Sequence, residues 1–451
     1  MKKIIGVFVF MIVLVFVIIY FYPKDNSITY AKDIAPIIYK NCTPCHRLGA
    51  QAPFLLQTYN DVVRRGKLIA HVVDSRIMPP WPADPDYSHF VGEKFLSKKE
   101  IELIKNWVEA GMPAGDLESM PEAPKFPDNS KLGKPDLVLQ MPEPFLVKGK
   151  NMDQFYLMKI PFEIPCDTFV KTIEFIPGSK KIVHHVNGHL ITYDEAKKKD
   201  VFAGKYYINT DSSTYEEGYK LMSIPNDDGT YPTLTPSATN YLPGVEGIIY
   251  PSGIGGFKIA KKGAILFKDI HYGPTAIDQI DQSICNIFYD TGPPKRPTAE
   301  IQLGTLGISK IEPPLVIPPN TVKTFRTQTT VPMDISLLTI NPHMHLLGKS
   351  FLAYAIKPTG DTIPLIRINK WDFRWQYFYT FKKMLKIPKG SVIKVEGIYD
   401  NTSGNPNNPF NPPEEVGERS GSMRVSDEMF QFIMTYIPYQ QGDENISLET
   451  Q

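Results

Sequence analysis

The chain has 451 residues and a formal net charge of +1 at neutral pH, with a pI of about 7.6. This balance of charge argues against a nucleic-acid partner, because nucleic acids are bound by strongly basic surfaces. The length exceeds that of one ordinary domain, and 41 prolines with 12% aromatic residues favour a β-rich protein with many ordered loops.

The chain begins with an apolar run. Lys2 and Lys3 precede an uncharged stretch from Ile4 to Tyr22, which is just long enough to span a bilayer as one helix. The run ends in bulky aromatic residues and not in the small residues of a cleavage site. Residues 1–24 are therefore predicted to be a transmembrane signal anchor, with a cleaved signal peptide as the alternative. The two lysines place the body of the protein outside the cytoplasm.

The next segment, residues 25–117, is predicted to be a small all-α domain around the motif CTPCH. Cys42 and Cys45 have the spacing that attaches c-type haem covalently, and His46 would then be an axial ligand of the iron. A chance occurrence in a redox or zinc protein is the alternative. Haem c is attached outside the bacterial inner membrane, so the body is expected in the periplasm of a single-pass inner-membrane protein.

A loop and a helix complete this domain. Met78 in SRIMPPWPADP is the predicted sixth ligand of the iron, since a thioether raises the haem potential and suits an electron carrier. His71 and Met112 are the alternatives. LSKKEIELIKNWVEAG predicts an amphipathic helix that begins with a capping box of Ser97 and Glu100. The haem motif, the MPP loop and this helix together resemble the small cytochrome c domains fused to bacterial oxidoreductases.

After a proline-rich linker at residues 118–130, the sequence changes character. Short β-type runs are separated by Gly, Pro, Asn and Asp turns. Such alternation is typical of β-sandwiches, and the remaining length is enough for two of them. Two all-β, jelly-roll-like sandwich domains are predicted, at residues 131–296 and 297–451.

Most histidines of the chain lie in these β-type runs. His343 and His345 are two residues apart, so on a strand both imidazoles point to one face. His184 and His185 are adjacent, and they can share one metal only at a bend or at a strand end. Imidazole with thioether favours copper over zinc or iron. The candidate copper ligands are His184, His185, His271, His343, His345 and Met429.

The motifs HH, HYG, HxHLLGK and SDEM occur in this order between about residues 131 and 440. This order resembles the copper type II ascorbate-dependent monooxygenases, the family of peptidylglycine α-hydroxylating monooxygenase and dopamine β-monooxygenase. The resemblance implies one copper in each of two jelly-roll-like domains. By motif position, the electron-transfer copper is implied at His184, His185 and His271, and the oxygen-binding copper at His343, His345 and Met429. His189 has no counterpart in the pattern and is expected to be structural or to support the ligands.

The resemblance also implies a function, which is hydroxylation of a C–H bond in an unidentified small organic substrate with O2. The reaction needs two further electrons, which the family draws from ascorbate. Here the haem is expected to pass electrons singly from an upstream periplasmic or membrane donor to the three-histidine copper. A non-catalytic haem and copper electron-transfer or copper-binding protein is the alternative, followed by a reductase of a small inorganic substrate.

The chain departs from the family at three points. The peptide-amidating enzymes have an arginine where this chain has Asn341 and a tyrosine where it has Ile433, so peptidylglycine is not the expected substrate. The many disulfides of the family are reduced to one candidate pair. Cys166 lies near the start of the first sandwich and Cys285 near its end, and a bridge between them is expected in an oxidising compartment.

Overall fold

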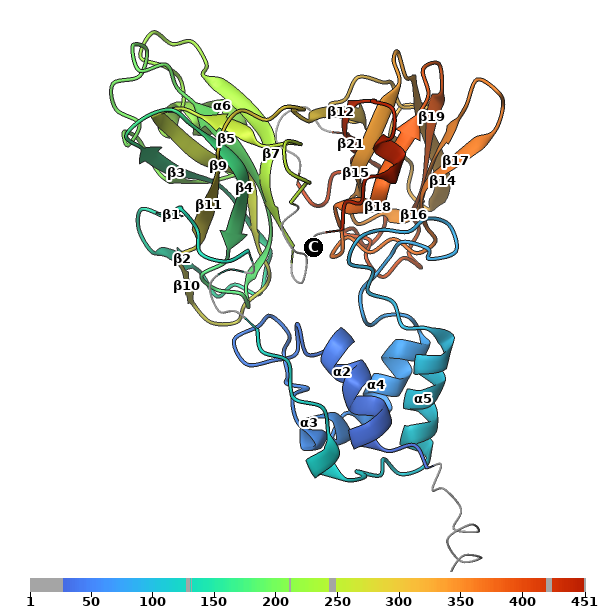
Figure 1. Cartoon of the computed structure of the whole chain (residues 1–451). Coiled ribbons are helices and arrows are strands. Elements are labelled where there is room, and N and C mark those ends of the chain that lie inside the picture. The colour runs from blue at the N-terminus through green and yellow to red at the C-terminus, as the bar shows by residue number, and fades with distance from the viewer. Residues whose placement is uncertain are drawn as a thin grey trace, which may run out of the picture. The chain divides into compact units, whose positions relative to one another are not determined.

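The computed structural model describes residues 27–126, 130, 132–210, 212–242, 249–418 and 424–449 (Figure 1). The predicted signal anchor at residues 1–24 lies outside this part of the chain. Within the described ranges, no helix is long and apolar enough to cross a membrane. The chain divides into two compact units. A helical unit comprises residues 1–43, 55–75 and 96–124, and a β-rich unit comprises residues 44–54, 76–95 and 125–451.

The helical unit packs short amphipathic helices around buried aromatic residues. Its elements are η1 (Tyr30–Ile34), α2 (Ala35–Asn41), α3 (Tyr59–Val63), α4 (Gly66–Asp74), α5 (Lys98–Glu109) and η2 (Leu117–Ser119). The predicted capping box of α5 is confirmed, because the Ser97 hydroxyl accepts from Glu100 N and the Glu100 carboxylate accepts from Ser97 N. Trp107 of α5 is fully buried and donates from Nε1 to Pro113 O at 3.0 Å. The described elements of this unit are all helical.

The first sandwich is built from two main sheets, with the strand orders β1-β11-β4-β8 and β6-β3-β9-β5-β7. Apolar side chains between its two sheets form one core. On the other face of the larger sheet, apolar residues such as Leu157, Ile191 and Leu266 form a second cluster with the segment around α6. Its elements are β1 (Leu137–Gln140), β2 (Phe145–Val147), β3 (Gln154–Glu163), β4 (Thr168–Ile176), β5 (Val183–Thr192), β6 (Tyr207–Asn209), α6 (Tyr215–Leu221), β7 (Thr233–Tyr241), β8 (Phe257–Ile259), β9 (Lys262–Tyr272), β10 (Gln279–Asp281) and β11 (Ile284–Asp290).

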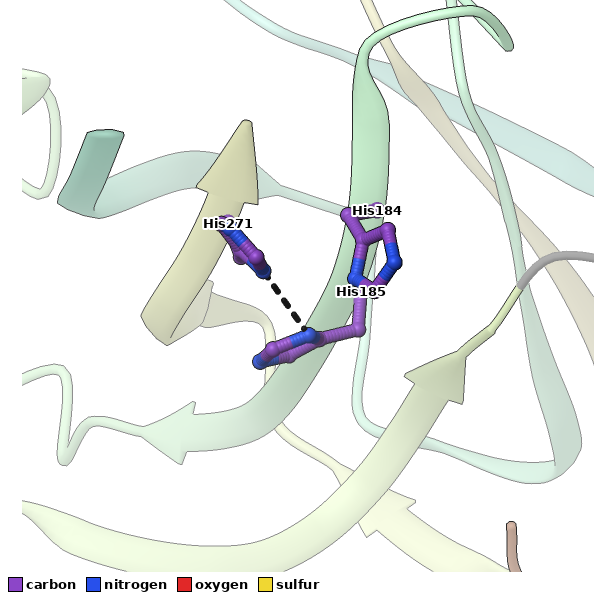
Figure 2. A group of neighbouring side chains, drawn as sticks. All are labelled: His184, His185 and His271. Atoms are coloured by element: carbon purple, nitrogen blue, oxygen red, sulfur yellow. Dashed lines mark hydrogen bonds between the residues drawn. The ribbon is translucent and has the colours of Figure 1, made fainter. Parts of the chain in front are cut away.

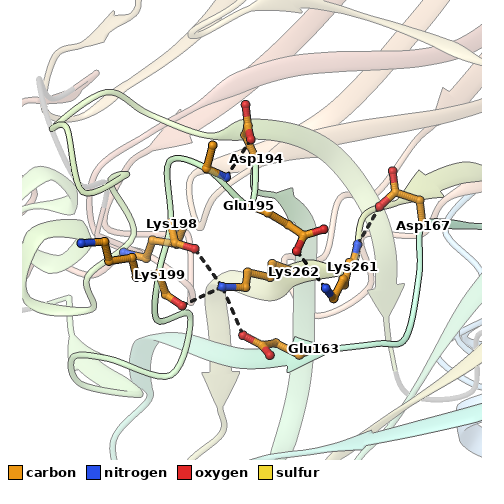
Figure 3. Close-up of polar contacts among 9 residues, drawn as sticks. Glu163, Asp167, Asp194, Glu195, Lys198, Lys199, Lys261 and Lys262 are labelled. Carbon is orange, nitrogen blue, oxygen red and sulfur yellow. Dashed lines mark hydrogen bonds and ion pairs between the residues drawn. The ribbon is translucent and has the colours of Figure 1, made fainter.

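A loop at residues 194–199 is tied to the start of β9 by polar contacts (Figure 3). Lys262 Nζ donates to the carbonyl oxygens of Lys198 and Lys199, at 3.1 and 2.7 Å. Lys261 Nζ forms an exposed ion pair with Glu195 at 2.9 Å. Exposed ion pairs add little to stability, so the carbonyl contacts of Lys262 attach this loop to β9 more firmly than the Glu195 pair does.

The second sandwich pairs the sheets β12-β21-β15-β18 and β14-β19-β16-β17. Its core is the larger of the two and is rich in aromatic residues. Its elements are β12 (Ala299–Gly304), β13 (Val316–Ile317), β14 (Thr321–Thr330), β15 (Ile335–Met344), β16 (Gly348–Ile356), β17 (Thr362–Ile368), β18 (Tyr379–Ile387), β19 (Val392–Asn401), β20 (Val416–Gly417), β21 (Phe430–Pro438) and η3 (Asp443–Asn445). The two predicted β-sandwiches are thus both present.

Residues 80–93, here called the strap, pack on the second sandwich, although the sequence predicts that they belong to the helical domain. Asp84 accepts from Arg367 Nε and Asn369 Nδ2, both at 2.8 Å, and its own N–H donates to the Arg367 carbonyl. Ala83 forms a β-bridge with Ile368 of β17, and Phe90 forms another with Phe381 of β18. The strap is therefore held by backbone and side-chain contacts along its whole length.

The predicted Cys166–Cys285 disulfide is not formed, since both thiols are free. The strand register explains why. Cys285 on β11 is opposite Phe175 of β4, whereas Phe169, three residues after Cys166, is opposite Asp290. Five residues of extended strand separate the two positions by about 17 Å, far beyond the reach of a disulfide. Cys285 is instead a buried core residue, and Cys166 is exposed.

The buried ion pair of Arg296 and Asp443 predicts a loss of stability in acid. Asp443 accepts from both terminal nitrogens of Arg296 at 2.7 Å, and this contact lowers the pKa of Asp443 to about 2. Because the folded pKa is below that of the unfolded chain, the stabilisation is complete above about pH 4 and is lost as the pH falls towards 2. Asp443→Asn should remove about 2 kcal/mol of this pH-dependent stability. Urea unfolding at pH 4 and pH 2 measures it, with the exposed neighbour variant Glu444→Gln as control. An unchanged pH dependence in Asp443→Asn would contradict the prediction.

Candidate metal centres

A β-bulge brings three histidines of the first sandwich together. Val183 is opposite Tyr272 and His185 is opposite His271, so His184 is an extra residue between these pairs. A bulge of this kind turns a side chain that a regular strand would direct to the other face. The expectation that the adjacent histidines can share a metal only at a bend or a strand end agrees with this geometry. His184, His185 and His271 form what is here called the three-histidine cluster.

The ring nitrogens of this cluster all lie within 4.8 Å of one another, which is close enough to hold one metal ion (Figure 2). The Nδ1 atoms of His271 and His185 are 3.2 Å apart. The ring centroid of His184 lies 4.8 Å from that of His271. Three imidazoles are suitable ligands for copper, and ring nitrogens this close to one another can bind the same metal ion.

Asp153 holds the His271 ring in place, although nothing in the sequence singles it out. Its carboxylate lies 2.6 Å from His271 Nε2, and Phe155 stacks on the same ring at 4.4 Å. Burial alone would raise the pKa of Asp153, but the hydrogen bond and charge of His271 outweigh it and lower this pKa. With Nε2 bound to the carboxylate, Nδ1 of His271 is the nitrogen left for a metal, as in other carboxylate–histidine–metal arrangements.

Burial keeps the imidazoles of His184 and His185 neutral. It lowers the pKa of His184 to about 4, with a further contribution from His271. Burial also lowers the pKa of His185 well below its ordinary value, and His343 and His345 of the second sandwich contribute to this shift. Neutral imidazole is the form that coordinates metals, so these ligands do not have to lose a proton at neutral pH.

A second cluster, His343, His345 and Met429, is formed where β15 meets β21. His343 is on β15 and His345 follows its last residue, and their ring centroids are 5.0 Å apart. This distance agrees with the shared face that the HxH spacing predicts. Met344 is opposite Phe430, so Met429, which precedes β21, lies at the same end of the strand pair as His345. We call these three residues the histidine–methionine cluster.

The ring of His345 is oriented by the chain just before Met429. Its Nδ1 lies 2.8 Å from the Asp427 carbonyl oxygen, so a proton on Nδ1 is donated there and Nε2 is left for a metal. Tyr399 donates to the Met429 carbonyl at 2.6 Å. Burial lowers the pKa of His343 to about 3, which keeps this ring neutral as well.

Glu428 joins the two strands that carry this cluster. Its buried carboxylate accepts from the N–H groups of His345, Leu347 and Met429, at 3.0, 2.6 and 3.3 Å. Burial nevertheless raises the pKa of Glu428 to about 8. The sequence motif SDEM contains this residue, but its role as a bridge between β15 and β21 follows only from the structure.

Glu428→Ala is expected to destabilise the second sandwich. Two buried N–H groups, of His345 and Leu347, would lose their acceptor, which costs about 3 kcal/mol in total. The measurement is the urea midpoint of the full chain, compared with Glu415→Ala, which removes an exposed carboxylate. Glu428→Gln keeps an acceptor oxygen and should lose less. Equal midpoints for Glu428→Ala and Glu415→Ala would refute this account.

The side chain of Asn341 forms its hydrogen bonds within the protein. Its side-chain amide donates to the carbonyl oxygens of Gln376 and Tyr377, at 3.4 and 2.9 Å. It therefore positions the segment at residues 371–378, between β17 and β18, and offers no charge to a substrate. Neither Asn341 nor the buried Ile433 carries a positive charge that would hold a carboxylate.

A cavity of about 650 Å³ lies next to this face, between β7 and the strands β15 and β21. Its lining is more apolar than polar but includes several hydroxyl groups, and Tyr250 contacts Thr339 there through an oxygen–oxygen distance of 2.8 Å. Glu300 also lines the cavity, and burial raises its pKa. Thr339 is on the same face of β15 as His343, so the cavity extends away from the histidine–methionine cluster along that strand.

His189 is buried on β5, and neither ring nitrogen has a hydrogen-bond partner among the described residues. Burial and the charge of Lys268 lower its pKa to about 3. It lies outside the three-histidine cluster, in agreement with the expectation that it is no ligand.

The residues of the haem motif have a geometry that suits an axial ligand. Cys42 and Cys45 are half-buried and form no disulfide. His46 Nδ1 lies 3.0 Å from the Phe54 carbonyl oxygen, and the two rings are in contact. A proton on Nδ1 would be donated to this carbonyl, which leaves Nε2 for iron.

The three candidates for the sixth ligand lie in different surroundings. Met78 is half-buried, just before the strap. His71 is exposed on α4, whereas the Met112 sulfur lies against the backbone of Gly66. Met78 remains the predicted ligand.

Comparison with known proteins bears on the second sandwich. Residues 303–445 match the family model described as copper type II ascorbate-dependent monooxygenase, C-terminal domain. These residues include the whole histidine–methionine cluster. A search of curated proteins gives no match.

Solved structures have only distant similarity to the chain. A structure of PNGF-II is 11% identical with a TM-score of 0.24, and the match covers 67% of this chain and 65% of that chain. The VP2 subviral particle of infectious bursal disease virus is 10% identical with a TM-score of 0.18, over 71% of this chain and 76% of that chain.

Proposed function

We propose that the chain is a membrane-anchored copper monooxygenase that hydroxylates a C–H bond of a small organic substrate with O2. The observation that carries the proposal is the combination of two different donor sets. One is three imidazoles in the first sandwich, and the other is two imidazoles and a thioether in the sandwich that matches the monooxygenase family. Only the histidine–methionine cluster has a soft ligand, Met429. This difference supports assigning oxygen binding to its copper and electron transfer to the three-histidine copper.

The residues around the clusters have defined tasks in this reaction. Copper, when bound, supplies one-electron redox chemistry and a coordination position for O2. Asp153 and the Asp427 carbonyl fix which nitrogen of His271 and of His345 faces the metal. Glu428 keeps His345 and Met429 at a fixed separation. We place the substrate in the cavity beside Thr339. Because Asn341 and Ile433 stand where the peptide-amidating enzymes have an arginine and a tyrosine, the substrate is not expected to be a peptidylglycine.

We further propose that a covalently bound c-type haem supplies the electrons. Cys42 and Cys45 would hold the haem, and His46 and Met78 would be the axial ligands of its iron. The contact of His46 Nδ1 with the Phe54 carbonyl supports this, because it is the contact that axial histidines need. An upstream periplasmic or membrane donor would reduce the haem. The anchor at residues 1–24 would hold the protein on the periplasmic side of a bacterial inner membrane.

The experiment is an isotope measurement on the full chain, purified from a bacterial periplasmic membrane fraction. With 18O2 and extracts of candidate metabolites, a monooxygenase places one 18O atom in an organic product. Covalent haem staining and copper content are determined on the same preparation. A haem and copper electron carrier would bind both metals and yield no labelled product, and that result would contradict the proposal.

Cysteine variants test the role of the haem. Cys42→Ala and Cys45→Ala are expected to abolish covalent haem staining and turnover with the physiological donor, while a small soluble reductant that reaches copper directly should restore part of the activity. Cys166→Ala serves as the matched control, because this thiol is exposed and lies outside the motif, in the first sandwich. Undiminished turnover with the natural donor in the absence of haem would refute the relay.

A further inference from the structure

An aromatic contact joins the strap to the second sandwich. The Trp81 ring lies 5.4 Å from the ring of Tyr377 and 5.3 Å from that of Tyr379, measured between centroids. Tyr377 also donates its hydroxyl proton to the Pro80 carbonyl oxygen at 2.8 Å. Trp81 follows Met78, the candidate haem ligand, by three residues. Trp81, which is close in sequence to the predicted haem ligand, thus packs directly on Tyr377.

The segment at residues 371–378 connects this contact to the histidine–methionine cluster. Phe373 meets the ring of His345 edge-on, with the centroids 5.5 Å apart. The Tyr377 carbonyl accepts from Asn341 at 2.9 Å, and Asn341 precedes His343 by two residues on β15. The same short segment therefore touches the strap through Tyr377 and the metal ligands through Phe373 and Asn341.

The three-histidine cluster is packed by a ring of its own sandwich, Phe155 of β3, which stacks on His271. Asp372 and Arg374 of the segment at residues 371–378 lie within electrostatic range of His184, but no ring of that segment stacks on this cluster among the described residues. Beside the cluster, Tyr241 of β7 is opposite Val186, the residue after His185. Burial raises the pKa of both Tyr241 and Tyr377, and Cys45 adds to each shift, so this thiol lies within electrostatic range of both phenols. Tyr377 alone is also in contact with the strap.

We propose that Trp81 and Tyr377 form the route by which electrons enter the copper site at His343, His345 and Met429, so that this site is reduced before the three-histidine site. The inference rests on the proposed function. It reverses the expected order in which the two coppers are reduced, because the haem is expected from the sequence to reduce the three-histidine copper. In each passage one electron leaves ferrous haem, which becomes ferric, and Cu(II) at the histidine–methionine cluster becomes Cu(I). No atom is transferred. The first electron would pass on to Cu(II) at the three-histidine cluster, so that after two passages each copper is Cu(I) and the two coppers together hold the two electrons that hydroxylation with O2 requires.

The test follows a single electron in the full chain loaded with haem and copper. The haem is reduced photochemically under anaerobic conditions while both coppers are oxidised. The haem absorption bands then report its reoxidation, and freeze-quenched electron paramagnetic resonance reports which Cu(II) signal disappears first. Three variants are compared with the unchanged chain. Trp81→Leu removes the aromatic ring of the route, Trp81→Phe retains one, and Phe90→Leu removes a ring of the strap that contacts Tyr379 and Phe381 but not the route.

Trp81→Leu is expected to slow haem reoxidation at least about tenfold, with Trp81→Phe and Phe90→Leu within about twofold of the unchanged chain. The first Cu(II) signal to disappear should be the one that is absent in a His343→Ala variant. Equal rates in Trp81→Leu and Phe90→Leu would overturn the route and leave the proposed function intact. Slowing by Tyr241→Leu, with the three-histidine signal lost first, would also overturn it. If the chain without substitutions is found to carry no covalent haem, both the route and the haem relay are refuted.

Discussion

His271→Ala is expected to leave the chain with one bound copper in place of two. The three nitrogens of its cluster come from β5 and β9, and the loss of the β9 ligand leaves only the two adjacent histidines of the bulge. Two imidazoles hold a copper ion far less firmly than three. The histidine–methionine cluster is on other strands of another sandwich, so its copper should remain. Copper content after dialysis against a weak chelator is the measurement.

Asp153→Asn is expected to weaken copper binding at the same site less than His271→Ala does. It keeps a hydrogen-bonding group beside His271 but removes the negative charge. Loss of such a supporting carboxylate typically weakens metal affinity about 10- to 100-fold, so a copper titration should give a weaker site with unchanged stoichiometry. The chain with His271→Ala should still bind carbon monoxide at its remaining reduced copper. Loss of both coppers in that variant would mean one shared site and would contradict two separate centres.

Met429→His is expected to retain two coppers and to lose most of the hydroxylation activity. A thioether is a soft ligand that favours Cu(I), the state that meets oxygen, whereas a third imidazole favours Cu(II). Product formation should fall at least about tenfold, which corresponds to about 1.4 kcal/mol on the barrier. Copper content, copper reduction kinetics and product formation are measured on one preparation, so that a loss of metal is distinguished from a loss of chemistry.

Full hydroxylation in Met429→His would remove Met429 from the ligand set. Two other methionines are near it in the sequence. Met434 is buried in the core of the second sandwich, on the strand opposite Ile340. Met423 lies outside the residues that the structure describes. Met434→Leu is therefore the matched control, because it removes a thioether from the core of the same strand and should leave both copper binding and product formation unchanged.

Local patterns in the sequence were enough to predict several features. The α5 cap depends on Ser97 and Glu100, which are three residues apart, and the shared face of His343 and His345 depends on strand alternation alone. The sandwich class followed from the rhythm of strands and turns. In each of these cases the cause and its effect lie within a few residues of each other.

Features that depend on distant residues were not predictable in this way. Asp153 reaches a histidine 118 positions away, and no motif surrounds it. The sequence of the strap has no periodic pattern. Its position is fixed by side chains nearly 300 positions later in the chain, which local patterns do not reveal. The failed Cys166–Cys285 pairing has the same origin, since the position of each cysteine within the first sandwich was correct but the strand register was unknown.

The strap has a consequence for the order in which the protein matures. The chain is synthesised from its N-terminal end, so Trp81 and Phe90 are made long before the strand β18 that they contact. Until about 300 further residues have been made, these apolar side chains lack that packing partner. A fragment ending near residue 125 would leave them without it permanently. The strap is thus made early and depends for its burial on the second sandwich, which is made last.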